Sequence, residues 1–118
     1  NYGFIKDTKG GDGDPVDAVV LSSQPVVPGV VIKCHAIGLL ETQDEKGEDA
    51  KVIMVPTAKI DPLYGEYQDI KDVPPALLNK IKHFFEHYKD LEPGKWIKTQ
   101  GWQGASAAQN LISSCLKK

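Results

Sequence analysis

The sequence Asp-Gly-Asp-Pro-Val-Asp (residues 12–17), followed directly by Ala-Val-Val-Leu (residues 18–21), decides the fold prediction. Its three carboxylates are two and three residues apart, and Gly13 lets the backbone turn tightly between the first two. Pro15 has a fixed φ and restricts Asp14 to extended conformations. The apolar run after Asp17 is typical of a buried strand. The sequence therefore predicts a rigid acidic turn that leads directly into a core strand.

The close spacing of like charges in residues 12–17 is compatible with two roles. Neighbouring carboxylates repel one another unless a cation lies between them, and their oxygens suit hard ions such as Mg²⁺ or Mn²⁺. Asp, Gly and Pro are also the ordinary residues of a solvated turn. This stretch by itself leaves a metal site and a plain acidic turn as alternatives.

The composition predicts one globular domain with a single core, covering residues 1–118. Hydrophobic residues make up 41% of the chain and charged residues 25%, and the formal net charge is −2. We therefore expect neither a nucleic-acid partner nor a membrane partner, and no apolar run approaches the roughly 20 residues of a membrane span. Cys34 and Cys115 lie in apolar contexts and are predicted to be buried free thiols in a reducing compartment, the cytoplasm.

The pattern along the chain predicts an α+β domain that is mainly β. Strands are expected at residues 2–5, 18–21, 30–40, 51–55 and 95–102. One helix is expected between Pro74-Pro75 and Pro93-Gly94, and another over residues 105–116. The charged segment 41–49, with Gly47 inside it, predicts the loop of a β-hairpin. Hairpin connections and a non-alternating order favour an antiparallel sheet or small barrel.

Two polar clusters lie on these predicted elements. Asp49 and Lys51 share one face of a strand by its two-residue period, so they form either a solvent-exposed ion pair or the lining of a polar cavity. On the long helix, His83, His87 and Asp90 share a face that we interpret as a surface or subunit-contact cluster rather than a zinc site. The core-facing stripe of that helix is predicted to consist of Leu77, Ile81, Phe84, Tyr88 and Leu91.

Four motifs together resemble the family I soluble inorganic pyrophosphatases of the bacterial type. They are the acidic turn at residues 12–17, Asn1-Tyr2-Gly3, the segment 47–51, and the segment 83–90, and the resemblance spans essentially all 118 residues. It implies an OB-like five-stranded barrel with flanking helices. It also implies hydrolysis of inorganic diphosphate to two phosphates by a metal-activated water, with several Mg²⁺ ions per site and Mn²⁺ or Zn²⁺ as possible substitutes.

The resemblance also implies a role for individual residues. Asp12, Asp17 and Asp49 would hold two activating metal ions, and Asp44 would join Asp49 in holding a metal that arrives with the substrate. Asp14 would take the proton from the attacking water. The residues expected to bind phosphate oxygens are Tyr2, Lys51, Tyr88 and Lys89.

The chain departs from the family pattern at its start. In the family, the segment before Asn1 supplies further active-site glutamates, a lysine, an arginine, a tyrosine and the early strands, whereas all 14 basic residues of this chain are lysines. We therefore expect the chain to correspond to the C-terminal two-thirds of the family domain, with the N-terminal strands missing. A catalytically inactive metal-binding or assembly fragment stays open as an alternative. An OB-type nucleic-acid module is disfavoured by the negative charge.

The resemblance further implies a homohexamer assembled through the face formed by His83, His87 and Asp90. Because histidine gains a proton just below neutral pH, we expect this assembly to break into smaller species as the pH falls through about 6.

Overall fold

The computed structural model describes residues 1–10, 13–45 and 47–116. Within these ranges the chain forms five strands and two α-helices, in an order that confirms the mainly β, α+β prediction. The strands are β1 (Tyr2–Phe4), β2 (Asp17–Val20), β3 (Cys34–Asp44), β4 (Gly47–Pro56) and β5 (Ile97–Gly104). The helices are α1 (Pro75–His87) and α2 (Ala105–Cys115), and two short 3₁₀ turns, η1 (Tyr64–Glu66) and η2 (Ile70–Asp72), lie between β4 and α1.

The strands form one sheet in the order β1-β2-β4-β3-β5. The predicted hairpin is confirmed, but its strands run on to the pair Asp44 and Gly47, so most of the charged segment 41–49 is strand rather than loop. The expectation of an antiparallel sheet is wrong at one ladder, because β2 pairs with β4 in parallel. The hairpin folds back so that β4 rather than β3 lies beside β2, and this sets Asp17 directly opposite Lys51.

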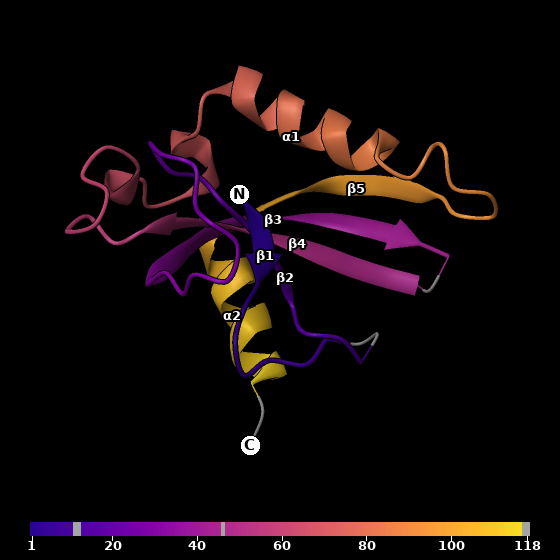
Figure 1. The fold of residues 1–118 in the computed structure, drawn as a ribbon, viewed down its shortest axis with the longest axis horizontal. Helices are drawn as coiled ribbons and strands as arrows, with labels where there is room; N and C mark the ends of the chain where they lie inside the picture. The colour runs from indigo at the N-terminus through magenta and orange to yellow at the C-terminus, as the bar shows by residue number, and fades with distance from the viewer. Residues whose placement is uncertain (11–12, 46, 117–118) are drawn as a thin grey trace.

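Both faces of the sheet are covered. Figure 1 shows α1 over one face and α2 against the other. Successive residues of β4 alternate between the two sides, so Ile53 belongs to the core under α1 and Val52 to the core against α2. In β3 the register shifts between Ala36 and Gly38, which places Ile37 in the same core cluster as Leu40 despite their odd spacing.

Gly38 is required by this irregularity in β3. A Cβ atom at this position would lie 2.7 Å from the main-chain oxygen of Gln103 on β5 and 2.8 Å from Cβ of Ile70 in η2. The missing side chain therefore lets β5 and η2 approach the bulge closely.

The predicted core stripe of α1 is wrong in three of its five residues. Phe84, Tyr88 and Leu91 are 53%, 40% and 97% exposed, whereas Phe85 is 1% exposed. The helix ends at His87, well before Pro93, so Leu91 is not on the helix at all. The inward face keeps Leu77 and Ile81 of the predicted stripe but adds Leu78 and contains Phe85 in place of Phe84. Sequence periodicity could not decide between the adjacent rings of Phe84 and Phe85, because either fits a helical stripe.

The cysteine prediction is also corrected. Both thiols are free, as expected, but Cys34 and Cys115 are half-buried rather than buried. Each lies at the end of an element, the start of β3 and the end of α2, where neighbouring elements cover it only in part. Among the helices of the described ranges, none has the length and apolar character needed to cross a bilayer.

Candidate active site

Lys51 on β4 is the centre of the candidate site. Its ammonium donates hydrogen bonds to Asp17 Oδ2 at 2.8 Å, to Asp49 Oδ2 at 2.6 Å and to the hydroxyl of Tyr2 at 3.1 Å. The side chain is buried, so the reading of Asp49 and Lys51 as a solvent-exposed ion pair is wrong. Their predicted shared face is confirmed, because β-strand alternation brings residues 49 and 51 to the same side. The parallel pairing of β2 adds Asp17, which sequence spacing could not place.

The electrostatics of this cluster keep Lys51 charged and Tyr2 protonated. Burial acts to lower the pKa of Lys51, but the hydrogen bonds to Asp17, Asp49 and Tyr2 outweigh it and raise the pKa above its ordinary value. Burial raises the pKa of Tyr2 to about 12, although the hydrogen bond from Lys51 works in the other direction. The Tyr2 hydroxyl accepts from Lys51 and keeps its own proton, which it can donate to an anionic oxygen.

The ring of Phe85 lies beneath this cluster. The Lys51 ammonium is 5.5 Å from the centroid of the Phe85 ring, and the Tyr2 ring packs edge-on at 5.6 Å between centroids. The Tyr88 ring lies perpendicular to Phe85 at 5.8 Å. The sequence interpretation missed Phe85. Leu78, Ile81 and Phe85 follow a helical spacing of i, i+3 and i+7, but Leu77, Ile81 and Phe84 fit a helical stripe equally well, so this signal could not single out Phe85.

A second ion cluster lies at the tip of the β3–β4 hairpin. Lys89, just after α1, contacts Asp44 Oδ2 at 3.1 Å and Glu45 Oε1 at 3.5 Å, and its ammonium lies 5.7 Å from the ring centroid of Tyr88. Burial acts to lower the pKa of Lys89, but the hydrogen bond to Asp44 outweighs it and raises the pKa. Glu45 was outside the predicted site; a second acid beside Asp44 was its only signal in the sequence.

The predicted general base, Asp14, lies in the loop that enters β2. Its side chain is exposed, and its main-chain oxygen accepts a hydrogen bond of 2.8 Å from the amide of Gly10. Asp12, a predicted metal ligand, lies outside the described residues. The structure thus brings Tyr2, Asp17 and Lys51 together with Asp49, and separately joins Asp44 and Lys89 beside Tyr88.

The carboxylates fit a divalent cation in their donor chemistry. Asp17 and Asp49 converge on one positive charge, that of Lys51, and carboxylate oxygens are the ligands that hard ions take. Within residues 1–10, 13–45 and 47–116, no three His, Cys, Asp or Glu side chains gather as a metal site. Asp17 and Asp49 are two of the four predicted ligands. Of the other two, Asp44 faces Lys89 in the second ion cluster, and Asp12 lies outside the described residues.

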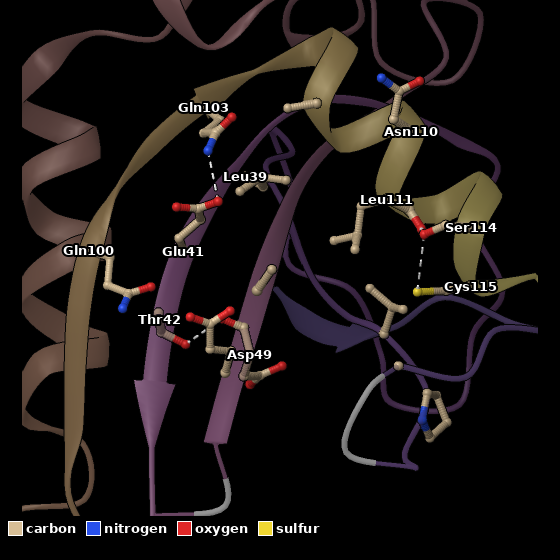
Figure 2. Close-up of a pocket in the computed structure, with 16 residues that line it drawn as sticks. Leu39, Glu41, Thr42, Asp49, Gln100, Gln103, Asn110, Leu111, Ser114 and Cys115 are labelled. Carbon is tan, nitrogen blue, oxygen red and sulfur yellow. Dashed lines mark hydrogen bonds between the residues drawn. The ribbon is translucent and has the colours of Figure 1, made fainter.

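A pocket of about 570 Å³ lies between the sheet and α2 (Figure 2). On its sheet side, Gln103 of β5 donates a 2.7 Å hydrogen bond to Glu41 of the neighbouring strand β3, and Asn110 and Leu111 of α2 border the opposite side. Asp49 borders the pocket, but Lys51 and Lys89 are not among its lining residues. Of the predicted phosphate-binding residues, Tyr2 and Lys51 lie in the Lys51 cluster and Tyr88 and Lys89 lie by the hairpin tip, and none of the four lines this pocket.

Comparison with known proteins agrees with this geometry. The model of the inorganic pyrophosphatase family matches residues 1–118. The inorganic pyrophosphatases of Aeropyrum pernix and Rickettsia bellii are each 51% identical to the chain, over all of it and 67% of their own lengths. The crystal structure of an inorganic phosphatase from Anaplasma phagocytophilum is 50% identical and superposes with a TM-score of 0.94, over 98% of this chain and 67% of that one. The chain belongs to the inorganic pyrophosphatase family.

Proposed function

We propose that this chain carries an active site that hydrolyses inorganic diphosphate to two phosphates with the help of Mg²⁺. The observation that supports this most directly is the buried Lys51 ammonium, held between Asp17 and Asp49 and next to the Tyr2 hydroxyl. A fixed cation beside converging carboxylates is the arrangement that a metal-assisted phosphoryl-transfer site needs. Family membership supports the same reaction, since the relatives are inorganic pyrophosphatases, hydrolases that act on diphosphate.

The side chains would divide the work. Asp12, Asp17, Asp44 and Asp49 would hold the divalent ions, which when bound neutralise phosphate oxygens and acidify water. Asp14 would accept the proton as the water oxygen forms its bond to phosphorus and the bridging P–O bond breaks. Four donors would fix the phosphate oxygens and stabilise the departing phosphate, namely Tyr2, Lys51, Tyr88 and Lys89. Because phosphoryl transfer asks little covalent chemistry of a protein, this positioning would supply most of the acceleration.

A catalytically inactive metal-binding or assembly fragment is the second candidate. The observation that favours it is coverage: the chain spans about two thirds of the length of the relatives it matches. We also propose that the protein acts in the cytoplasm and assembles as a homohexamer through His83, His87 and Asp90. All three side chains are exposed on the described surface, which supports their availability for such a contact.

Phosphate release from diphosphate distinguishes the two candidates. The 118-residue chain would be assayed with Mg²⁺ and with EDTA, beside a chimera in which it replaces the matching two thirds of the Aeropyrum pernix protein. We expect Mg²⁺-dependent release by the chimera, and Lys95→Met in the chimera, which alters an exposed pair with Glu92, should leave the rate unchanged. A silent chimera that still folds and binds Mg²⁺ would contradict the proposal and favour the inactive fragment. Release by the chimera but not by the chain alone would show that the site needs the remaining third.

A further inference from the structure

We propose that Phe85 is a positioning residue for the phosphate-binding side chains, and this inference rests on the proposed function. Its ring contacts three of the four proposed phosphate-binding residues, and these come from three separate parts of the fold. Tyr2 lies on β1, Lys51 on β4 and Tyr88 immediately after α1. The three share contact with the Phe85 ring.

The geometry of each contact depends on the aromatic ring rather than on its bulk alone. Tyr2 and Tyr88 meet Phe85 edge to face, with interplanar angles of 66° and 90°. Such pairs are attractive because the positive edge of one ring meets the negative face of the other. The Lys51 ammonium at 5.5 Å from the ring centroid lies within the range of a cation–π contact, which also depends on the π face.

Burial makes Phe85 a fixed reference for these groups. Its side chain is 1% exposed and belongs to the core cluster that includes Ile37, Leu40 and Ile53. Tyr2 is 51% exposed and β1 is only three residues long, so local structure alone restrains the phenol weakly. The ring contact and the hydrogen bond from Lys51 together hold the Tyr2 hydroxyl beside the ammonium.

The test separates placement from stability by means of two substitutions at position 85 and one elsewhere in the core. Phe85→Leu keeps an apolar side chain but removes the ring, whereas Phe85→Tyr keeps the ring and adds a buried hydroxyl. Ile37→Ala is the matched control, because it removes apolar volume from the same fully buried cluster without altering a ring. The free energy of unfolding of each variant would be measured by urea denaturation.

The position of the Tyr2 ring relative to Lys51 is measured by NMR on the unliganded chain, through the nuclear Overhauser effect between the Tyr2 ring protons and the Lys51 ε-methylene. We expect this signal in the parent chain, in Phe85→Tyr and in Ile37→Ala, and its loss in Phe85→Leu. Persistence of the signal in Phe85→Leu, or its equal loss in Ile37→Ala, would overturn the proposal.

Binding of imidodiphosphate, a non-hydrolysable diphosphate analogue, gives the functional readout by calorimetry with Mg²⁺ present. We expect Phe85→Leu to bind it roughly tenfold more weakly, with Phe85→Tyr close to the parent even if it is less stable. Affinities that simply follow the unfolding free energies across the three variants would assign Phe85 a structural role only. Failure of both the parent chain and the chimera to bind the analogue would contradict the proposed function, while the NMR comparison would still decide the placement of Tyr2.

Discussion

The Lys51 ammonium lies 2.6 Å from Oδ2 of Asp49, two residues earlier on the same strand. A second carboxylate, that of Asp17, lies 2.8 Å from the same nitrogen, so one buried cation is paired with two acids and the three groups together carry one negative charge. A divalent ion entering this site would meet both the carboxylates and the lysine that already faces them. The balance between these charges can be tested by removing the lysine.

Lys51→Met should destabilise the chain and increase its response to Mg²⁺. Without the ammonium, Asp17 and Asp49 repel each other in a partly buried setting, at a cost of about 1–3 kcal/mol. Mg²⁺ should restore part of the lost stability, because an ion that binds the folded state and not the unfolded state stabilises the folded state. Thermal unfolding with and without Mg²⁺ measures both effects. Lys95→Met is the control, because Lys95 forms an exposed ion pair with Glu92 whose loss should lower stability by less than about 1 kcal/mol. An equal Mg²⁺ shift in both variants would show that Lys51 does not face the ion.

Asp14→Asn should abolish most turnover in the active chimera without weakening Mg²⁺ binding. The amide cannot accept the proton of the attacking water, and loss of a general base typically lowers kcat by about 10²–10⁴-fold. Steady-state phosphate release gives kcat, and calorimetry gives the Mg²⁺ affinity. Asp7→Asn is a matched control in the preceding loop, because Asp7 is exposed and its φ of 61° is a conformation that Asn tolerates well. A rate near that of Asp7→Asn would remove Asp14 from the mechanism.

Gly65→Ala should lower the melting temperature by about 4–12 °C. Gly65 is buried in η1, and a Cβ atom there would lie 2.4 Å from Cα and 2.6 Å from the amide nitrogen of Ala58. Relieving that clash requires a backbone shift costing about 1–3 kcal/mol. Gly3→Ala is the control, since nothing lies within 4 Å of the Cβ it would add. Circular dichroism melts of the two variants make the comparison, and equal melting temperatures would mean that η1 moves freely away from Ala58.

Stability should fall as the pH drops below about 5, and Asp61 should contribute to the slope. Its carboxylate accepts hydrogen bonds from the amide of Ser23 at 2.7 Å and from that of Tyr64 at 3.2 Å, and these bonds hold its pKa below the ordinary value of an aspartate in the folded chain. The unfolded chain therefore binds a proton at higher pH than the folded chain does. The stabilisation is complete well above the unfolded pKa and is lost as the pH falls toward the folded one.

Urea midpoints of the parent and of Asp61→Asn at pH 7, 5 and 4 measure this contribution. The variant should be less stable at pH 7 but should lose less on acidification, because Asn does not titrate. Asp69, whose pKa is also lowered, chiefly by the amide of Ala105, should leave a residual slope. Parallel pH curves for the parent and the variant would exclude Asp61 as a source of acid sensitivity.

The proposed hexamer should dissociate between pH 8 and pH 5. The rings of His83 and His87 lie 4.3 Å apart between centroids, and Nδ1 of His87 is 2.9 Å from Oδ2 of Asp90. Protonation of both rings would place two positive charges against one carboxylate at a contact that repeats in a symmetric assembly. Light scattering across this range gives the mass, with His83→Gln/His87→Gln as the variant whose mass should not change with pH. A parent chain that is monomeric at pH 8, or that keeps its mass at pH 5, would contradict the assembly.

The sequence by itself determined the local elements and the chemistry they carry. Turn residues and apolar runs located the acidic loop, the β3–β4 hairpin and both helices, because these signals depend on neighbours only a few residues away. The two-residue period of a strand was enough to put Asp49 and Lys51 on one face, since that relationship is local.

Only the tertiary structure decided which distant segments meet. The parallel pairing that brings Asp17 to Lys51 joins residues 34 positions apart, and no local pattern specifies it. The choice of Phe85 over Phe84 as the buried ring depends on how α1 docks on the sheet, and the helix ends at His87 instead of running on to Pro93. Local periodicity describes one element at a time, whereas register between strands and the docked face of a helix are selected by burying both sheet faces at once.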